Sequence, residues 1–310
     1  MSCVILKPDV KGNALKLETI EKVAFNLIRD AAIFLPEDVT SQLRKAIDRE
    51  SHSTAKAQLQ VILDDVELAE KQRAPICQDT GTVTFFVKIG CAVSNLAGIE
   101  AALYAATRKA TSEVPLRPNA VDSFTELNSG DNTGRFVPCI HWESSEKDGL
   151  ELTVILKGGG SENVSRLGML TPAEGVKGLK RFVVDSVIEA GAQPCPPTIV
   201  GVAAGGGADV ALELAKKALL RPLGEHNPEP RIAALEKELL AAINMTGIGP
   251  MGLGGDTTAL GVHVDYAHRH PASFPVAVVF NCWAHRKASA QIGSDGQVRY
   301  LNKKSSGIAQ

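Results

Sequence analysis

The spacing of the apolar residues changes near residue 70, and this change constrains the fold more than any other feature of the chain. Up to that point apolar side chains recur at steps of three and four residues, which predicts amphipathic helices within 13–70. Beyond it, short runs rich in β-branched residues predict strands, with helical spacing between them. The expected strands are 82–89, 150–156, 198–204, 260–264 and 274–280, and the expected helices are 98–110, 171–190, 208–220 and 231–243. The sequence therefore predicts an α+β (mixed α/β) fold, in which a helical N-terminal region precedes mixed β-sheets covered by helices.

No stretch of the chain resembles a linker, so we expect one domain over residues 1–310. Within it we expect a helical subregion at 1–70, an α/β region with the candidate sites at 71–290, and a polar tail at 291–310. Hydrophobic residues make up 44% and charged residues 22%, as in ordinary globular proteins.

Charge and composition exclude several functional classes. The formal net charge is −2, so no global positive field attracts nucleic acid, and the aromatic content of 5% argues against base-stacking surfaces. No apolar run approaches the roughly 18 residues of a membrane span. The apolar start is interrupted by Lys7 and Asp9, unlike a signal peptide. We therefore expect a cytoplasmic protein with no nucleic-acid partner, no membrane partner and reduced thiols.

Three of the six cysteines lie at the ends of expected strands. Cys77 precedes the first strand, Cys195 stands between two prolines before 198–204, and Cys282 follows 274–280. They are 118 and 87 residues apart, unlike the closely paired ligands of zinc fingers and ribbons. Such spacing suits a group held by three separate loops, although each cysteine can equally be a small buried apolar residue. We interpret Cys91 and Cys139 as small buried apolar residues of this kind, and Cys3 lies near the terminus.

Glycine-rich loops are the second unusual feature. Residues 158–160 follow an expected strand, 205–207 precede an expected helix, and 247–255 contain five glycines. Consecutive glycines let the backbone approach a ligand and direct its N–H groups at an anion. The alternative for each is a tight turn between a strand and a helix. None matches a nucleotide-binding motif.

Several ionisable residues are candidates for chemistry. Asp79 stands two residues after Cys77 and can act as an acid or base, or cap its turn. Arg117 lies between two prolines and can clamp a carboxylate or form a surface ion pair. His270 can transfer protons or lie in a solvated loop. His285 and Arg286 follow Cys282 closely, where they can orient it or form ordinary ion pairs.

Eight segments, taken in order, resemble the N-terminal (α) part of the class I, iron–sulfur-dependent fumarate hydratases and the related L(+)-tartrate dehydratases. The matching segments are ICQDTG at 76–81, PLRPNA at 115–120, KGGGSENVS at 157–165, AQPCPP at 192–197, RPLG at 221–224, GIGPMG at 247–252, RHP at 269–271 and CWAHR at 282–286. Each segment alone is weak, but the ordered set extends over about 15–290 and is specific.

The resemblance implies a [4Fe–4S] cluster held by Cys77, Cys195 and Cys282. Three protein ligands for four irons leave one iron open as a Lewis acid, so the implied reaction is the reversible hydration of fumarate to (S)-malate without redox change. An open iron also implies sensitivity to oxygen.

The resemblance assigns the substrate contacts by motif position. It implies that Gln78 and Asp79 contact substrate and that Asp79 also donates or accepts a proton. Arg117 is expected to clamp the distal carboxylate, and Gly159 or Gly160 to offer a backbone N–H group. By the same resemblance, His270 assists proton transfer.

Single-chain members of the family carry a further β domain that completes the pocket, and the family pattern here ends near residue 290. The resemblance therefore implies the α subunit of a two-subunit enzyme, active only with a separate β subunit, as a heterodimer or α2β2 assembly. KGGGSEN favours the fumarase version over tartrate dehydratase, and a mesaconate hydratase stays open. The alternatives outside this class are a non-catalytic iron–sulfur binding or electron-transfer module and a cluster-free structural subunit.

Overall fold

The computed structural model describes residues 15–91 and 93–301, and its contacts divide the chain into two compact units. Unit 1 comprises the described residues of Met1–Ala31, Thr82–Ile155 and Ala288–Gln310. Unit 2 comprises Ala32–Gly81 and Leu156–Lys287. The chain therefore passes from unit 1 to unit 2 and back twice.

Unit 2 is built on a four-stranded sheet in the order β4-β7-β5-β6. Its strands are β4 (Arg166–Leu170), β5 (Thr198–Ala204), β6 (Ala259–Tyr266) and β7 (Phe274–Asn281). Its helices are α2 (Glu37–Arg49), α3 (Ser53–Gln72), α5 (Gly159–Asn163), α6 (Gly175–Ala190), α7 (Ala208–Ala218) and α8 (Pro230–Asn244), with short 3₁₀ turns η1 (Pro172–Glu174) and η2 (Pro250–Gly252). β5 runs parallel to β6, and β7 runs antiparallel to both β5 and β4.

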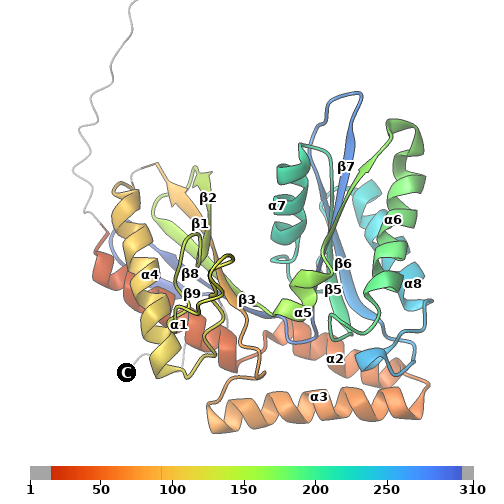
Figure 1. The fold of residues 1–310 in the computed structure, drawn as a ribbon, viewed down its shortest axis with the longest axis horizontal. Coiled ribbons are helices and arrows are strands. Elements are labelled where there is room, and N and C mark those ends of the chain that lie inside the picture. The colour runs from red at the N-terminus through yellow and green to blue at the C-terminus, as the bar shows by residue number, and fades with distance from the viewer. Residues whose placement is uncertain (1–14, 92, 302–310) are drawn as a thin grey trace, which may run out of the picture. The chain divides into compact units, whose positions relative to one another are not determined.

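Strand alternation divides the apolar side chains of this sheet between two cores. Ile199 and Ala203 of β5 pack on one face with residues of α2, α3 and α7, whereas Val200 and Val202 pack on the other with α6 and α8. Figure 1 shows α7 on one side of the sheet and α6 and α8 on the other. Burying each such side chain stabilises the fold by about 1.5–3 kcal/mol. Gly201 lets α7 pack directly on β5, since a Cβ there would lie 2.1 Å from the carbonyl oxygen of Ala215.

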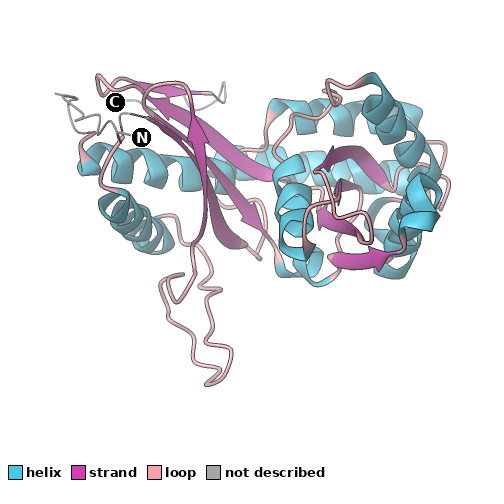
Figure 2. Ribbon diagram, turned by 90° about the horizontal axis from the view of Figure 1, so that it is seen from above, coloured by secondary structure: helices cyan, strands magenta, loops and turns pink. Residues whose placement is uncertain are grey.

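Unit 1 contains a five-stranded sheet in the order β2-β1-β3-β8-β9. Its elements are α1 (Leu17–Ile33), β1 (Thr82–Gly90), α4 (Leu96–Glu113), β2 (Cys139–Ser145), β3 (Leu150–Lys157), β8 (Arg286–Ile292) and β9 (Val298–Tyr300); the last two residues of α1 and β3 and the first two of β8 belong to unit 2. β1 and β2 are parallel, and a long loop connects α4 to β2 (Figure 2).

The α+β class predicted from the sequence is confirmed, as are the N-terminal helices and all five expected strands, with shifts of one or two residues. The segment predicted as a polar tail contains β9, which pairs antiparallel with β8. Cys3 lies outside the described residues. In the part of the chain that the structure describes, no helix is both long and apolar enough to cross a bilayer.

Candidate functional site

The loops of Cys195 and Cys282 meet at one end of the sheet in unit 2, where β5 begins and β7 ends. Cys195 lies between α6 and β5, and Cys282 lies between β7 and β8. Because β7 is antiparallel to β5, its last residue pairs with the start of β5, Ile199 opposite Asn281. The backbone N–H of Trp283 then donates to the carbonyl of Cys195 over 3.3 Å, which joins the two loops directly.

Cys77, between α3 and β1, joins this pair. Burial raises the pKa of the Cys195 thiol, and the neighbouring Cys77 and Asp79 raise it further. Burial also raises the pKa of Cys282, and Cys195 and Cys77 add to that effect while Arg286 opposes it. Negative charge on Cys77 therefore acts on both Cys195 and Cys282, and negative charge on Cys195 acts on Cys282. Ionised together they repel one another, so a bound cation favours the ionised set.

Glycines allow the loops around these cysteines to approach closely. A Cβ on Gly160 would lie 2.8 Å from the carbonyl oxygen of Gln193, two residues before Cys195. A Cβ on Gly158 would lie 2.9 Å from Oδ2 of Asp79. The glycine-rich segment therefore fits between two cysteine loops, and larger residues would push them apart. By contrast, a Cβ on Gly159 would meet only Asp79 Oδ2, at 3.9 Å.

Asp79 ties the loop of Cys77 to the glycine segment. Its Oδ1 accepts from the N–H of Gly81 at 3.0 Å, and its Oδ2 accepts from the N–H of Gly159 at 2.8 Å. The carboxylate is thus held in one orientation. Arg286, from the start of β8, donates through Nη1 to the backbone carbonyl of Asp79 at 2.7 Å. The same residue that follows Cys282 therefore fixes the loop that follows Cys77.

A buried lysine lies beside the glycine segment. Nζ of Lys157 is 2.7 Å from Oε2 of Glu162, whose other oxygen is 3.1 Å from Nζ of Lys216. Burial lowers the pKa of Lys157 to about 8, although Glu162 and the thiol of Cys282 act in the opposite direction. Lys157 therefore places a cationic, titratable group beside the cysteines.

His285 is a structural residue of the turn after Cys282. The side chain is fully buried, with Nδ1 2.6 Å from Nδ2 of Asn281 and Nε2 2.9 Å from the carbonyl oxygen of Leu219. An amide donor on one nitrogen and a carbonyl acceptor on the other select the neutral tautomer protonated at Nε2. Burial and the charge of Lys287 hold the pKa of His285 well below its usual range. The imidazole therefore braces the Cys282 turn as a neutral group.

His270 is a predicted site residue that the structure does not bring to the cysteines. Gln78 follows Cys77 and is exposed. His270 is exposed in the loop between β6 and β7, at the end of the sheet where β5 finishes, whereas Cys195 and Cys282 lie where β5 begins. β5 separates these ends by roughly 20 Å, at about 3.3 Å per residue. Arg117 belongs to unit 1, where its carbonyl accepts from Nδ2 of the buried Asn132 at 3.0 Å.

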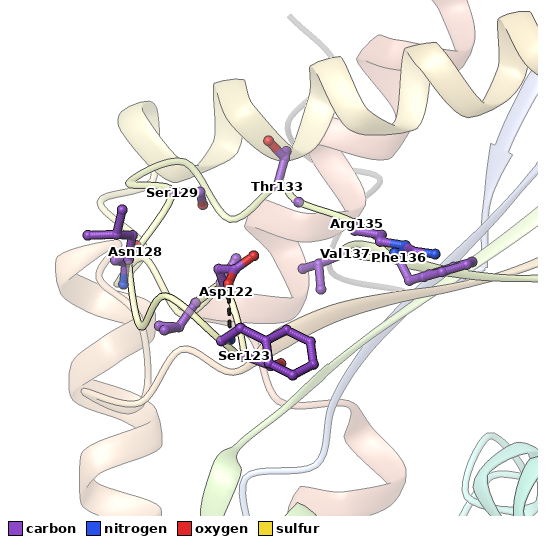
Figure 3. Close-up of a pocket in the computed structure, with 13 residues that line it drawn as sticks. Asp122, Ser123, Asn128, Ser129, Thr133, Arg135, Phe136 and Val137 are labelled. Carbon is purple, nitrogen blue, oxygen red and sulfur yellow. Dashed lines mark hydrogen bonds between the residues drawn. The ribbon is translucent and has the colours of Figure 1, made fainter.

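A separate pocket of about 570 Å³ lies within the long loop of unit 1, and Figure 3 shows its lining. Asp122 stabilises this loop by accepting from the N–H groups of Phe124 and Thr125 at 3.0 and 2.8 Å. Phe124 is almost completely exposed, and Phe136 is largely exposed. None of the predicted site residues lines the pocket, so it is distinct from the cysteine loops.

Comparison with known proteins identifies the family of the chain. A sequence model described as "Fumarate hydratase (Fumerase)" matches residues 21–291. The chain belongs to the fumarate hydratase family. This confirms the resemblance seen in the ordered motifs.

Curated relatives of this fumarate hydratase family member cover most of its length. The chain is 46% identical over 283 residues to a protein of Methanocaldococcus jannaschii named "Putative L(+)-tartrate dehydratase subunit alpha", covering 90% of this chain and 99% of that relative. It is 38% identical over 262 residues to the "L(+)-tartrate dehydratase subunit alpha" of Escherichia coli strain K12, covering 84% of this chain and 86% of the relative. A Shigella sonnei protein of the same name matches to the same extent.

The three cysteines of this fumarate hydratase family member are a donor set of the kind that an iron–sulfur group takes. In the described ranges, no three histidine, cysteine, aspartate or glutamate side chains converge to hold one metal ion. A cluster distributes its protein ligands over separate irons and takes cysteine thiolates. Cys77, Cys195 and Cys282 are half-buried free thiols.

Sequence reasoning missed several residues that shape the site. The buried Lys157 pairs with Glu162, and both belong to a segment that carried the family resemblance. Asn281 precedes Cys282 and positions His285, and Gln193 sets the space for Gly160. A lysine at the end of an apolar strand was the available signal for Lys157, because such a position is normally occupied by an uncharged residue.

Proposed function

We propose that this chain is the α subunit of an iron–sulfur-dependent hydro-lyase that reversibly hydrates fumarate to (S)-malate. The meeting of the three cysteine loops is the observation that carries the proposal: Trp283, next to Cys282, donates to the carbonyl of Cys195, and Arg286 donates to the carbonyl of Asp79, two residues after Cys77. Membership of the fumarate hydratase family supports the reaction class. Since thiols must stay reduced to hold iron, we also propose a cytoplasmic location.

The proposed cofactor is a [4Fe–4S] cluster held by Cys77, Cys195 and Cys282. Bound there, it supplies Lewis acidity to a carboxylate and a hydroxyl of the substrate. The chain's own residues hold and shield it: Gly160 allows the close approach of the loop of Cys195, and the buried His285 fixes the turn of Cys282.

We assign the proton transfer at the substrate carbon to Asp79. Two backbone N–H groups orient its carboxylate, and the loop that carries it also carries Cys77. In malate dehydration a base removes the proton from the carbon next to the carboxylate, and the hydroxyl leaves as water with a second proton; hydration reverses both steps. Gln78 is proposed as a neighbouring substrate contact.

The remaining substrate roles are proposals from the family motif. Since the N–H of Gly159 donates to Asp79, Gly160 is the better candidate for a backbone donor to substrate. Arg117 is proposed to clamp the distal carboxylate. His270 is proposed to assist proton transfer, and its position at the other end of the sheet makes His270→Asn a direct check of that assignment.

A second substrate, L(+)-tartrate, is favoured by a specific observation. The relatives named above carry the name L(+)-tartrate dehydratase subunit alpha. Tartrate differs from malate by one hydroxyl, so the same proton abstraction and loss of water apply. The names also support a β subunit, since this chain matches 99% of the Methanocaldococcus jannaschii α subunit. We propose a heterodimer or α2β2 assembly that is active only with β.

Anaerobic assays of the purified chain test this function. The chain, reconstituted with iron and sulfide, is assayed with fumarate, malate, L(+)-tartrate and mesaconate, with and without its β partner. We expect turnover only with β, and faster turnover of fumarate and malate than of tartrate. The reverse ranking would identify a tartrate dehydratase. The outcome is different for an electron-transfer module. In that case the cluster-loaded α–β complex would turn over none of these acids, and adding substrate would leave its spectrum unchanged.

A further inference from the structure

Arg286 is a buried cation with an unused hydrogen-bond donor. Its side chain is 1% exposed, and it heads the fully buried side chains of the described residues by volume. Nη1 donates to the backbone carbonyl of Asp79, but Nε has no partner. Of the buried side-chain nitrogen and oxygen atoms that the structure describes, the only others without a partner belong to Ser165. An arginine is always charged, so leaving one of its N–H groups unpaired in the interior is costly.

Other buried cations of unit 2 have different surroundings. Nζ of Lys287 donates to the carbonyls of Leu220 and Arg221 at 3.1 and 3.2 Å and lies 3.7 Å from Oδ2 of Asp38. Lys157 pairs with Glu162. These lysines are satisfied by oxygen atoms of the chain itself. The orphaned donor of Arg286 therefore points to an acceptor that the polypeptide does not supply.

The surroundings of Arg286 identify the chemistry of that acceptor. Arg286 stands four residues after Cys282, and its charge acts on that thiol. Its Nη1 binds the loop two residues after Cys77, and its Nη2 lies 3.7 Å from the position that a Cβ of Gly158 would take. The guanidinium thus lies where two cysteine loops meet the glycine segment. Iron held by Cys77, Cys195 and Cys282 would bring negative charge and sulfur acceptors to this place.

We propose that Arg286 is a positioning residue for the iron–sulfur centre, and that its Nε–H donates to a sulfur atom of the loaded site. This inference rests on the proposed function and deepens it. Through Nη1 the same side chain holds the carbonyl of Asp79, so Arg286 couples the geometry of the sulfur site to the proposed proton-transfer group. Hydrogen bonds to sulfur raise the reduction potential of a cluster and slow the loss of its metal.

The test compares wild type with Arg286→Lys and Arg286→Gln after anaerobic reconstitution. Iron and sulfide per chain, the rate of iron loss to a chelator and the midpoint potential of the cluster are measured. Arg286→Lys keeps the charge and one flexible donor, whereas Arg286→Gln removes the charge. We expect iron loss about 10- to 100-fold faster in Arg286→Gln, an intermediate rate in Arg286→Lys, and a potential more negative than wild type in both.

Arg221→Gln is the matched control. Arg221 is also largely buried in unit 2, but it pairs with Glu236 and donates to the carbonyl of Val264 at 3.2 Å. We expect Arg221→Gln to lower the melting temperature of the iron-free chain without changing the cluster potential. Equal iron loss in Arg221→Gln and Arg286→Gln would overturn the inference, because general destabilisation would then account for it.

Three further outcomes are decisive. Arg286→Gln with wild-type iron retention and potential, even at reduced activity, overturns the inference and leaves the proposed function standing. If only the KM for substrate rises, the donor serves the substrate and the inference is wrong. A wild-type chain that takes up no iron and sulfide contradicts both the inference and the proposed function.

Discussion

Acid sensitivity of the fold is predicted quantitatively by one buried histidine. His263 of β6 is 2% exposed, and its Nδ1 lies 3.0 Å from the carbonyl oxygen of Ala218. Burial lowers its pKa from 6.5 to about 4, and the charge of Arg221 acts in the same direction. Between these two values the unfolded chain binds a proton that the folded chain does not. The free energy of unfolding therefore falls as the pH drops from 6.5 towards 4.

The size of the effect follows from the two pKa values. Integrated from pH 7.5 to 4.5, the His263 contribution lowers the free energy of unfolding by about 2.5 kcal/mol, at about 1.36 kcal/mol per unit of pKa shift. His263→Asn removes this titration while keeping a donor for Ala218. We expect the stability difference between wild type and variant to shrink by that amount over this range.

Urea unfolding of the iron-free, reduced chain, followed by far-UV circular dichroism at four pH values, measures the difference. The variant is expected to be less stable near neutrality, because it loses packing, and to lose less stability in acid. His268→Asn is the control, since that side chain is exposed and its difference from wild type should stay constant. A constant difference for His263→Asn as well would refute the reasoning.

Three further variants test the site. Asp79→Asn should keep wild-type iron content and lower turnover of the reconstituted α–β enzyme by about 100- to 10,000-fold; near-normal turnover would remove Asp79 from the mechanism. Gly160→Ala, whose Cβ meets the Gln193 carbonyl, should lower the free energy of unfolding by about 1–3 kcal/mol and reduce iron content, whereas Gly159→Ala should do neither. Equal melting temperatures and iron content in the two variants would contradict the packing argument. Lys157→Met should gain stability relative to wild type below pH 8 and lose that advantage as the pH rises to 10.5, since the buried lysine titrates near 8; urea midpoints that differ equally at pH 7 and 10.5 would contradict this.

Local patterns in the sequence predicted the elements with strong apolar periodicity. They missed the strands whose polar residues are stabilised by residues distant in the sequence. β5 and β7 are continuous apolar runs and were predicted within a residue. β8 begins with Arg286 and Lys287, a charged pair that in the sequence is typical of a loop. In the structure, Asp38 and backbone carbonyls distant in the sequence pair with these two side chains. The short β4 and β9 likewise depend on their pairing partners.

The position of the site was only partly predictable for the same reason. Expected strand ends located all three cysteines, but a strand's sequence does not give its direction. Cys195 precedes β5 and Cys282 follows β7, and they meet because β7 is antiparallel to β5. The same topology carries His270 to the opposite end of the sheet. The segment that holds Lys157 was recognised, but the burial of Lys157 and its pairing with Glu162 depend on how the loop folds.

Iron counting after anaerobic reconstitution tests whether Cys77, Cys195 and Cys282 hold an iron–sulfur cluster. Wild type is compared with Cys77→Ser, Cys195→Ser and Cys282→Ser, and with Cys139→Ser, whose thiol belongs to unit 1, as the control. We expect about four irons and four sulfides per wild-type chain. We also expect the same content in Cys139→Ser and a large loss in each of the other three variants. Wild-type iron content in all three variants would contradict a centre built on these sulfurs.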